Sequence, residues 1–145
     1  MKDLVASYFG SAPGETFCIG AYRFVSAEEN GVLLYAPEAY WKLTTEDKKH
    51  MGCGPGKWGD RAVPDSILGL DIKPACSIHD VCYAEGRTDE DKVIADILFL
   101  MNMLSIVHTK SWPVLRQIRS HQALTYYLVV EEYGESSFRH GKEIS

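Results

Sequence analysis

The central part of this chain contains the sequence Ala75-Cys76-Ser77-Ile78-His79-Asp80-Val81-Cys82-Tyr83, whose polar residues are spaced as on one α-helix. Residues four apart lie on one face of an α-helix, whereas neighbouring residues diverge by about 100°. In a helix, His79 and Tyr83 would therefore point to the same side, and Asp80 would be turned aside. The spacing predicts a helix that presents a base and a phenol to one neighbour and a carboxylate to another.

This helix is expected to run from Lys73 or Pro74 to about Ala84. Proline is tolerated in the first turn, because the N–H that it lacks has no partner within the helix there. Gly86 follows as a natural stop, since glycine is common just beyond the end of a helix. The expected helix is shorter than the two that follow it in the chain.

Two long helices that pack together are predicted after Gly86. The first begins at Thr88-Asp89-Glu90-Asp91, where a threonine followed three residues later by an acid resembles a capping box. The second begins near Ser111 and Pro113 and stops at Gly134. The first has a wide apolar face, typical of a buried helix, made of Ile94, Ile97, Leu98, Met101, Leu104 and Val107. The second carries Val114, Leu115, Ile118, Leu124, Tyr127, Val130 and Tyr133.

A small N-terminal β-hairpin is predicted before the helices. Thr16 to Val25 has the apolar and aromatic content of a strand, and Glu28-Glu29-Asn30-Gly31 supplies a turn before the run Val32-Leu33-Leu34-Tyr35. Thr44-Thr45-Glu46-Asp47 is typical of the capped start of a short helix. The tail from Glu135 is polar and is expected to be poorly ordered.

The chain is predicted to be one mainly α domain over residues 1–145. A length of 145 residues suits a single domain, and a hydrophobic content of 46% supports a real core. Neither an internal repeat nor a low-complexity segment interrupts it. We divide it into an N-terminal hairpin with a short helix at 1–50, a core at 51–134 and the polar tail at 135–145.

Charge and hydropathy limit the partners that this chain can have. The net charge of −5 argues against nucleic-acid binding and against binding to anionic membranes through charge alone. No apolar run approaches the roughly 20 residues that span a bilayer, and the N-terminus lacks the pattern of a signal peptide. We therefore expect a protein made in the cytoplasm and delivered, if at all, by a non-classical route. Lipid contact would rest on aromatic side chains, although each candidate is more simply a core or rim residue: Trp41, Trp58 and Trp112.

Asp96 is a candidate functional residue because it lies in the apolar sequence Ile94-Ala95-Asp96-Ile97-Leu98. A carboxylate among such neighbours needs a polar partner. His79 suits this role, and its unperturbed pKa of about 6.5 leaves it neutral and able to accept a proton near neutrality. A carboxylate bonded to one ring nitrogen would fix the tautomer and stabilise the imidazolium. Asp91, one helical turn and a residue earlier, is the alternative partner.

A glycine-rich loop, Gly52-Cys53-Gly54-Pro55-Gly56, precedes the first helix, and its backbone is free to wrap a cation or an oxyanion. This loop, together with Cys76-x-x-His79-Asp80-x-Cys82-Tyr83 and Asp96, resembles the active site of the secreted-type, calcium-dependent phospholipases A2. The motifs stand in the order of the family and cover roughly residues 52 to 104. The small number of cysteines is similar to the short bacterial and phage branch of that superfamily.

The resemblance implies a phospholipase A2-like core and calcium-dependent hydrolysis of the sn-2 ester of glycerophospholipids, at a membrane surface or in dispersed lipid. It implies a general base that activates water, a carboxylate that orients this base, a phenol behind the site and a backbone amide for the oxyanion. These candidate catalytic residues are, in turn, His79, Asp96, Tyr83 and Gly54. The ligands implied for Ca2+ are one carboxylate and three carbonyl oxygens, from Asp80, Gly52, Gly54 and Gly56.

The resemblance also implies a disulfide between Cys53 and Cys76. The chain departs from the family at Ala75 and Ala95, where the family has cysteines, and its segment between the loop and the first helix is several residues longer. Four cysteines are too few for a disulfide-built scaffold, so core packing is expected to stabilise the domain.

Other interpretations of the same residues stay open. Cys76-x-x-His79-x-x-Cys82 has the composition of a zinc site, but the two cysteines would lie about 240° apart around one helix. Cys18 and Cys82 are most simply buried thiols. The alternative function is that of a non-catalytic binding or structural protein with the same fold, for example a phage or secretion-system component. The remaining histidines are expected on the surface or at its rim: His50, His108, His121 and His140.

Overall fold

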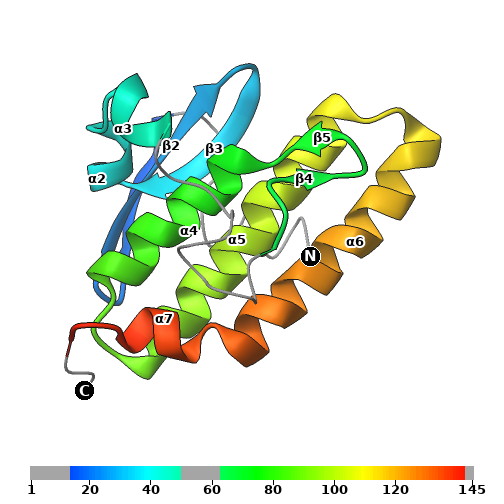
Figure 1. Cartoon of the computed structure of the whole chain (residues 1–145). Coiled ribbons are helices and arrows are strands. Elements are labelled where there is room, and N and C mark those ends of the chain that lie inside the picture. Colours follow the sequence, from blue (N-terminus) through cyan, green and yellow to red (C-terminus); the bar gives the residue numbers. More distant parts are fainter. Residues whose placement is uncertain (1–13, 50–62, 143–145) are drawn as a thin grey trace.

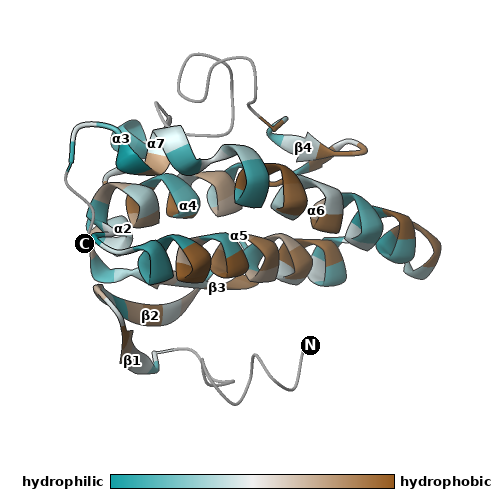
Figure 2. Ribbon diagram, turned by 90° about the horizontal axis from the view of Figure 1, so that it is seen from below, coloured by the Kyte–Doolittle hydropathy of each residue, from teal (hydrophilic) through white to brown (hydrophobic). Residues whose placement is uncertain are grey.

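The fold is organised around the long helix α5 (Asp89–Lys110). The computed structural model describes residues 14–49 and 63–142. Helix α5 packs against α4 (Lys73–Glu85) and α6 (Pro113–Tyr133), and it also contacts strand β3 (Val32–Pro37) (Figure 1). The sheet lies below α5, and α4 and α6 lie above it (Figure 2). The predicted class is confirmed to this extent: the described residues form mainly helices, with a small N-terminal antiparallel sheet.

The N-terminal sheet has three antiparallel strands, β1 (Thr16–Ile19), β2 (Tyr22–Glu29) and β3, in that order. Asn30 and Gly31 join β2 to β3 with φ angles of 53° and 80°, as in the tight hairpin turns that suit twisted strands. The turn predicted there is confirmed, but the single strand expected over Thr16–Val25 is wrong. Gly20 reverses the chain with a φ of 59°, so this stretch forms β1 and the first half of β2.

Asp91 holds this turn against the start of α5. Its Oδ1 accepts a hydrogen bond from the N–H of Ala21 at 3.0 Å, and its Oδ2 accepts from the N–H groups of Arg87 and Thr88 at 2.8 and 3.1 Å. The Asp91 N–H donates to Thr88 Oγ1 at 3.1 Å, which confirms the predicted capping box. A Cβ at Gly20 would lie 2.3 Å from Asp91 Oδ1, so only glycine fits beside this carboxylate.

The predicted bounds of α4 and α6 and the predicted start of α5 are confirmed to within a residue or two. Helix α4 ends before Gly86, but positive φ is not the reason, because this glycine has a φ of −61°. A Cβ there would lie 2.5 Å from the Phe138 ring and 2.7 Å from the Tyr22 hydroxyl. Close packing therefore selects glycine at the end of α4.

Helix α6 begins at Pro113 and ends before Gly134, as expected.

Several short elements complete the described part of the chain. The predicted short helix is α3 (Thr45–Lys49), capped by reciprocal hydrogen bonds between Thr44 and Asp47, both 3.1 Å. The sequence did not predict α2 (Glu38–Trp41) or the hairpin of β4 (Ser66–Ile67) and β5 (Leu70–Asp71).

The segment after Gly134 was expected to be poorly ordered, and this is wrong for the residues that the structure describes. They form helix α7 (Glu135–Arg139), whose Phe138 side chain is fully buried. The Phe138 ring meets Tyr83 edge-on, with ring centroids 5.2 Å apart. The buried Phe138 ring therefore docks this polar segment on the core, together with an ion pair between Arg139 and Asp89 at the surface.

Burial follows the predicted pattern closely on α5 and poorly on α6. Leu98, Met101 and Val107 are buried, whereas Ile97 is 40% exposed. On α6 the buried apolar residues are Ala123, Tyr126 and Val130, and most of the other predicted apolar positions are exposed. By length and composition alone α5 passes the test for a membrane span, but 61% of its most apolar window is buried within the fold. This burial accounts for its apolar composition as that of a core helix.

The Asp91 junction gives a test of the fold. Asp91→Ala removes the partner of three backbone N–H groups, so the free energy of unfolding should fall by about 2–4 kcal/mol. Glu90→Ala, at an exposed position in the same turn, is the matched control and should change it by less than about 0.5 kcal/mol. Urea unfolding of the three proteins makes the comparison. Equal stabilities for both variants would show that Asp91 does not hold the turn to the helix.

Candidate active site

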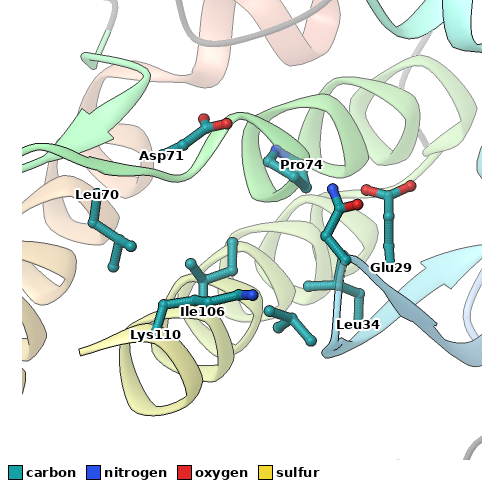
Figure 3. Close-up of a pocket in the computed structure, with 9 residues that line it drawn as sticks. Glu29, Leu34, Leu70, Asp71, Pro74, Ile106 and Lys110 are labelled. Carbon is teal, nitrogen blue, oxygen red and sulfur yellow. The ribbon is translucent and has the colours of Figure 1, made fainter. Parts of the chain in front are cut away.

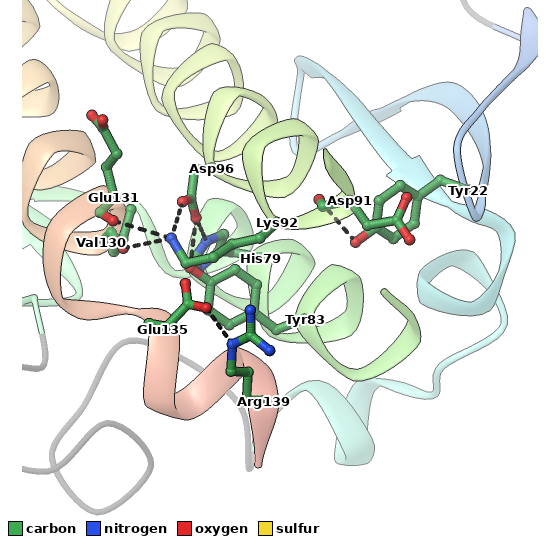
Figure 4. A network of polar contacts seen from close by, with 10 residues as sticks. All are labelled: Tyr22, His79, Tyr83, Asp91, Lys92, Asp96, Val130, Glu131, Glu135 and Arg139. Atoms are coloured by element: carbon green, nitrogen blue, oxygen red, sulfur yellow. Dashed lines mark hydrogen bonds and ion pairs between the residues drawn. The ribbon is translucent and has the colours of Figure 1, made fainter. Parts of the chain in front are cut away.

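His79 and Asp96 meet between α4 and α5, and both are almost completely buried. The His79 Nε2 atom lies 2.8 Å from Asp96 Oδ1, and the two side chains are 1% and 2% exposed (Figure 4). Tyr83, one turn after His79 on α4, donates its hydroxyl to the same Oδ1 at 2.6 Å. The structure thus brings together three of the residues that the sequence selected. Asp91, the alternative partner, instead accepts hydrogen bonds from the N–H groups of Ala21 and Arg87. It is therefore not the partner of His79.

The position of the carboxylate determines which ring nitrogen of His79 carries the proton. An ionised carboxylate only accepts hydrogen bonds, so the neutral imidazole must donate from Nε2, and its lone pair is then on Nδ1. The ring stacks on Phe99 at 4.7 Å between centroids and contacts the Tyr83 ring at 4.1 Å. Contact with the rings of Phe99 and Tyr83 therefore fixes the plane of the imidazole, and the hydrogen bond to Asp96 fixes its tautomer.

Lys92 also belongs to this cluster, and the sequence reasoning missed it. Its ammonium lies 2.8 Å from Asp96 Oδ2, one helical turn along α5, and the residue is only 7% exposed. It also donates to the carbonyl oxygens of Val130 and Glu131 on α6, at 3.4 and 3.1 Å. The signal that would have found it is the spacing: a lysine four residues from an acid on one helix face is within reach of it.

The electrostatics of the cluster favour a charged carboxylate beside a protonated phenol. Burial opposes ionisation of Asp96, but hydrogen bonding and charge from His79, with the hydrogen bonds from Lys92 and Tyr83, outweigh it and hold the pKa below its ordinary value. The pKa of Tyr83 is raised, first by burial and then by the negative charge of Asp96. Tyr83 is therefore a hydrogen-bond donor at every physiological pH.

Asp80, the predicted carboxylate ligand of calcium, follows His79 on α4 and is half-buried. The predicted carbonyl ligands Gly52, Gly54 and Gly56 lie outside the described residues, as does the proposed oxyanion donor, the amide of Gly54. Among residues 14–49 and 63–142 there is no group of three or more His, Cys, Asp or Glu side chains placed to hold a metal. A single carboxylate fits a hard cation whose other ligands are backbone oxygens, as the sequence suggested.

The cysteines argue against the zinc interpretation. Cys76 is disulfide-bonded and so cannot supply a thiolate, while Cys82 is a free, fully buried thiol whose pKa is raised by burial. Cys53, the expected partner of Cys76, lies outside the described residues. Cys18 is also a free thiol, but it is exposed, so the expectation that it is buried is wrong. It lies on β1 at the edge of the sheet, where its side chain faces solvent.

Of the remaining candidates from the sequence, those that the structure describes do not belong to this cluster. His108, His121 and His140 are exposed, as predicted, and His50 falls outside the described residues. Trp112 is 79% exposed, whereas Trp41 is partly buried and donates its indole N–H to the Val25 carbonyl at 2.9 Å. Trp58 is not among the residues that the structure describes.

A separate small cavity of about 180 Å³ lies between the β2–β3 hairpin, the start of α4 and the end of α5 (Figure 3). Its apolar lining includes Leu34, Leu70 and Ile106. The charged side chain of Glu29 at its edge is already paired with Lys48 at 2.9 Å. Neither His79 nor Asp96 lines this cavity, so we assign it no part in the site.

Comparison of the chain with protein-family models, with curated proteins and with solved structures gave no match. The functional interpretation therefore rests on the residues and their geometry.

The ionised state of Asp96 predicts how stability depends on pH. Asp96→Asn leaves the Lys92 ammonium buried without a charged partner, so at neutral pH the free energy of unfolding should fall by about 2–4 kcal/mol. Because the pKa of Asp96 is lowered in the folded state from 3.8, this contribution is present above that value and is lost as the pH falls through the folded pKa. Urea unfolding measures this: the difference in free energy of unfolding between wild type and Asp96→Asn should be smaller near pH 3 than near pH 7.

Asp89→Asn is the matched control for this comparison. Asp89 lies on the same helix, but its ion pair with Arg139 is at the surface, with 66% of the Asp89 side chain exposed. Its substitution should change the free energy of unfolding little at either pH. A destabilisation by Asp96→Asn that is equally large at both pH values would contradict an ionised Asp96.

Proposed function

We propose that this chain is a phospholipase A2-like enzyme that hydrolyses the sn-2 ester of glycerophospholipids in a calcium-dependent reaction. The observation that carries the proposal is the buried hydrogen bond between His79 Nε2 and Asp96 Oδ1, made by the two residues that the sequence motif selects. If the histidine and the carboxylate did not touch, the proposal would rest on the sequence resemblance alone. Their contact supplies the geometry that a general base requires.

The proposed role of His79 is to take a proton from the attacking water on Nδ1, while Nε2 stays bonded to Asp96. Asp96 is a positioning residue: it holds the tautomer, and its negative charge stabilises the imidazolium formed when the proton moves. Tyr83 and Lys92 hold Asp96 in turn, through one oxygen each. The products would be a fatty acid and a lysophospholipid.

Water is the proposed nucleophile, without an acyl-enzyme intermediate. The chain contains no Gly-x-Ser-x-Gly sequence, the signature of a serine nucleophile in hydrolases with that motif. Cys82 is a poor nucleophile because burial raises the pKa of its thiol and keeps it protonated. A histidine held by a carboxylate is suited to deprotonating water directly.

The proposed calcium site uses Asp80 and the carbonyl oxygens of Gly52, Gly54 and Gly56. Bound there, the cation would supply Lewis-acid chemistry, by holding the substrate phosphate and polarising the ester carbonyl. On α4, Asp80 is turned about 100° from His79, so the base and the proposed ligand approach a substrate from different angles. Glycine suits the loop positions because it lets the backbone come close to an ion, and the Gly54 amide is the proposed oxyanion donor.

The substrate would be reached at a phospholipid surface or as dispersed lipid. Exposed apolar side chains, Trp112 above all, are candidates for contact with lipid, because the net charge of −5 does not favour anionic membranes. The second candidate function is that of a non-catalytic protein with the same fold. The intact and correctly bonded pair of His79 and Asp96 favours the enzyme, since a binding protein has no need of an oriented base.

Replacement of the base tests the proposed chemistry. His79→Gln keeps a polar side chain but cannot take the proton, so release of fatty acid should fall by at least ~100-fold while the protein stays folded. His121→Gln, at an exposed position on α6, is the control and should keep wild-type activity. The assay uses phosphatidylcholine vesicles whose two acyl chains differ, and mass spectrometry identifies the acid released. Wild-type activity in His79→Gln would exclude His79 as the base.

Replacement of the proposed ligand tests the metal. Asp80→Asn removes the only charged ligand, so calcium affinity should fall by at least ~100-fold, and activity with it. Isothermal titration with calcium measures affinity without any substrate, and Asp89→Asn serves again as an exposed carboxylate control. Equal calcium binding by wild type and Asp80→Asn would place the metal elsewhere.

A further inference from the structure

Lys92 is the charged residue of the cluster for which the proposed reaction has no direct use. Its ammonium has three N–H groups and three acceptors within reach: Asp96 Oδ2 at 2.8 Å, the Glu131 carbonyl at 3.1 Å and the Val130 carbonyl at 3.4 Å (Figure 4). We propose that Lys92 is a positioning residue that fixes the orientation of the Asp96 carboxylate and ties the His79–Asp96 pair to the C-terminal end of α6.

The three donors divide the two oxygens of the Asp96 carboxylate between them. His79 and Tyr83 both use Oδ1, at 2.8 and 2.6 Å, and Lys92 uses Oδ2. A rotation of the carboxylate would break all three contacts at once. Without Lys92, Oδ2 would have no ammonium to hold it, and the carboxylate could turn about the bond to its Cβ. Lys92 therefore adds a restraint on the second carboxylate oxygen that His79 and Tyr83, which both use Oδ1, do not supply.

The position of Lys92 does not depend on Asp96 alone. Val130 and Glu131 lie in the last turn of α6, where the helix dipole is negative. The Val130 carbonyl also accepts the Gly134 N–H at 2.9 Å, so Lys92 is a second donor to it. An ammonium is the group that satisfies such carbonyls and is stabilised by that dipole. The end of α6 thus fixes Lys92 from one side, and Lys92 passes this constraint to Asp96.

The same end of α6 also lies against Tyr83. A Cβ at Gly134 would lie 2.4 Å from the Tyr83 hydroxyl oxygen and 2.5 Å from the Val130 carbonyl oxygen. Gly134 therefore allows the chain to close directly behind the phenol. Two of the three donors to Asp96 are consequently set in place by the stretch from Val130 to Gly134, which contributes no side chain to the proposed chemistry.

Orientation, more than stability, is what Lys92 contributes. Removing two charges from water costs about as much as their attraction returns, so a buried ion pair adds little net stability over apolar packing. A base whose orienting carboxylate is free to turn loses rate, because small displacements of a catalytic group are costly. The kinetic part of this inference rests on the proposed hydrolase function, whereas the contact between Lys92 and Asp96 can be tested without it.

The first measurement uses wild-type protein and needs no activity. In protein labelled with 15N and 13C, the Lys92 ammonium should give a signal protected from exchange with water and a hydrogen-bond scalar coupling from its Nζ to the Asp96 Cγ. The other lysine ammonium groups that are exposed to solvent should show neither. A Lys92 ammonium that exchanges as fast as those of exposed lysines would overturn the inference, whether or not the protein hydrolyses lipid.

The second measurement compares kcat and KM for hydrolysis of a phospholipid in variants. Lys92→Met removes all donors at similar length and should lower kcat about 10- to 100-fold, with KM changed less than about twofold. Lys92→Gln keeps a neutral donor for Oδ2 and should recover part of this loss. Lys48→Met is the matched control, because it removes a partly buried ion pair with Glu29, 2.9 Å long and away from the site, and should leave kcat unchanged.

The outcomes separate this inference from the proposed function. Unchanged kcat in a folded Lys92→Met protein would overturn the positioning role, and a loss of kcat that Lys48→Met shares equally would reduce it to a general effect on stability. If Lys92→Met does not fold, Lys92→Gln and the wild-type coupling decide. If wild-type protein releases no fatty acid but shows the coupling, the proposed function fails while the role of Lys92 in fixing Asp96 stands.

Discussion

The rest of the structure depends on one constraint, the burial of the Asp96 carboxylate. A charge that is 2% exposed must have its lone pairs satisfied, and here the donors come from His79 and Tyr83 on α4 and from Lys92 on α5 itself. Lys92 in turn needs the carbonyl oxygens at the end of α6. A shift of any of these three helices would leave a buried polar group without a partner. The same contacts therefore hold the three helices together and fix the geometry of the site.

The same requirement explains how a small chain can hold a base in a fixed state. The imidazole of His79 is confined by Phe99 and Tyr83, and its Nε2 proton is assigned by Asp96. Reaction chemistry would then fall to Nδ1 on the other side of the ring. Asp80, the next residue on α4, faces a different direction, which lets one helix serve both the proposed proton transfer and the proposed cation. Asp91 holds the sheet in a similar way, because its hydrogen bonds attach the β1–β2 turn to the start of α5.

Much of this arrangement could be predicted from local signals. Thr88 with Asp91, Pro113 and Gly134 mark helix ends by short-range chemistry, and Asp96 is conspicuous as an acid among apolar residues. The failures have physical causes that a one-dimensional pattern does not contain. Gly20 splits a strand because Asp91, distant in sequence, lies against it, and α7 is ordered because Phe138 finds a place on the core. Lys92 was missed because lysine is usually at the surface, and its burial is explained by Asp96 together with the carbonyl oxygens at the end of α6.

The most direct test of this account is the tautomer of His79 in solution. Long-range 1H–15N spectra of protein labelled at histidine distinguish a proton on Nε2 from one on Nδ1. At neutral pH we expect His79 to carry its proton on Nε2 alone, protected from exchange with water, and we expect Asp96→Asn to produce a mixture of tautomers. A wild-type His79 protonated on Nδ1, or one that exchanges rapidly between tautomers, would contradict it.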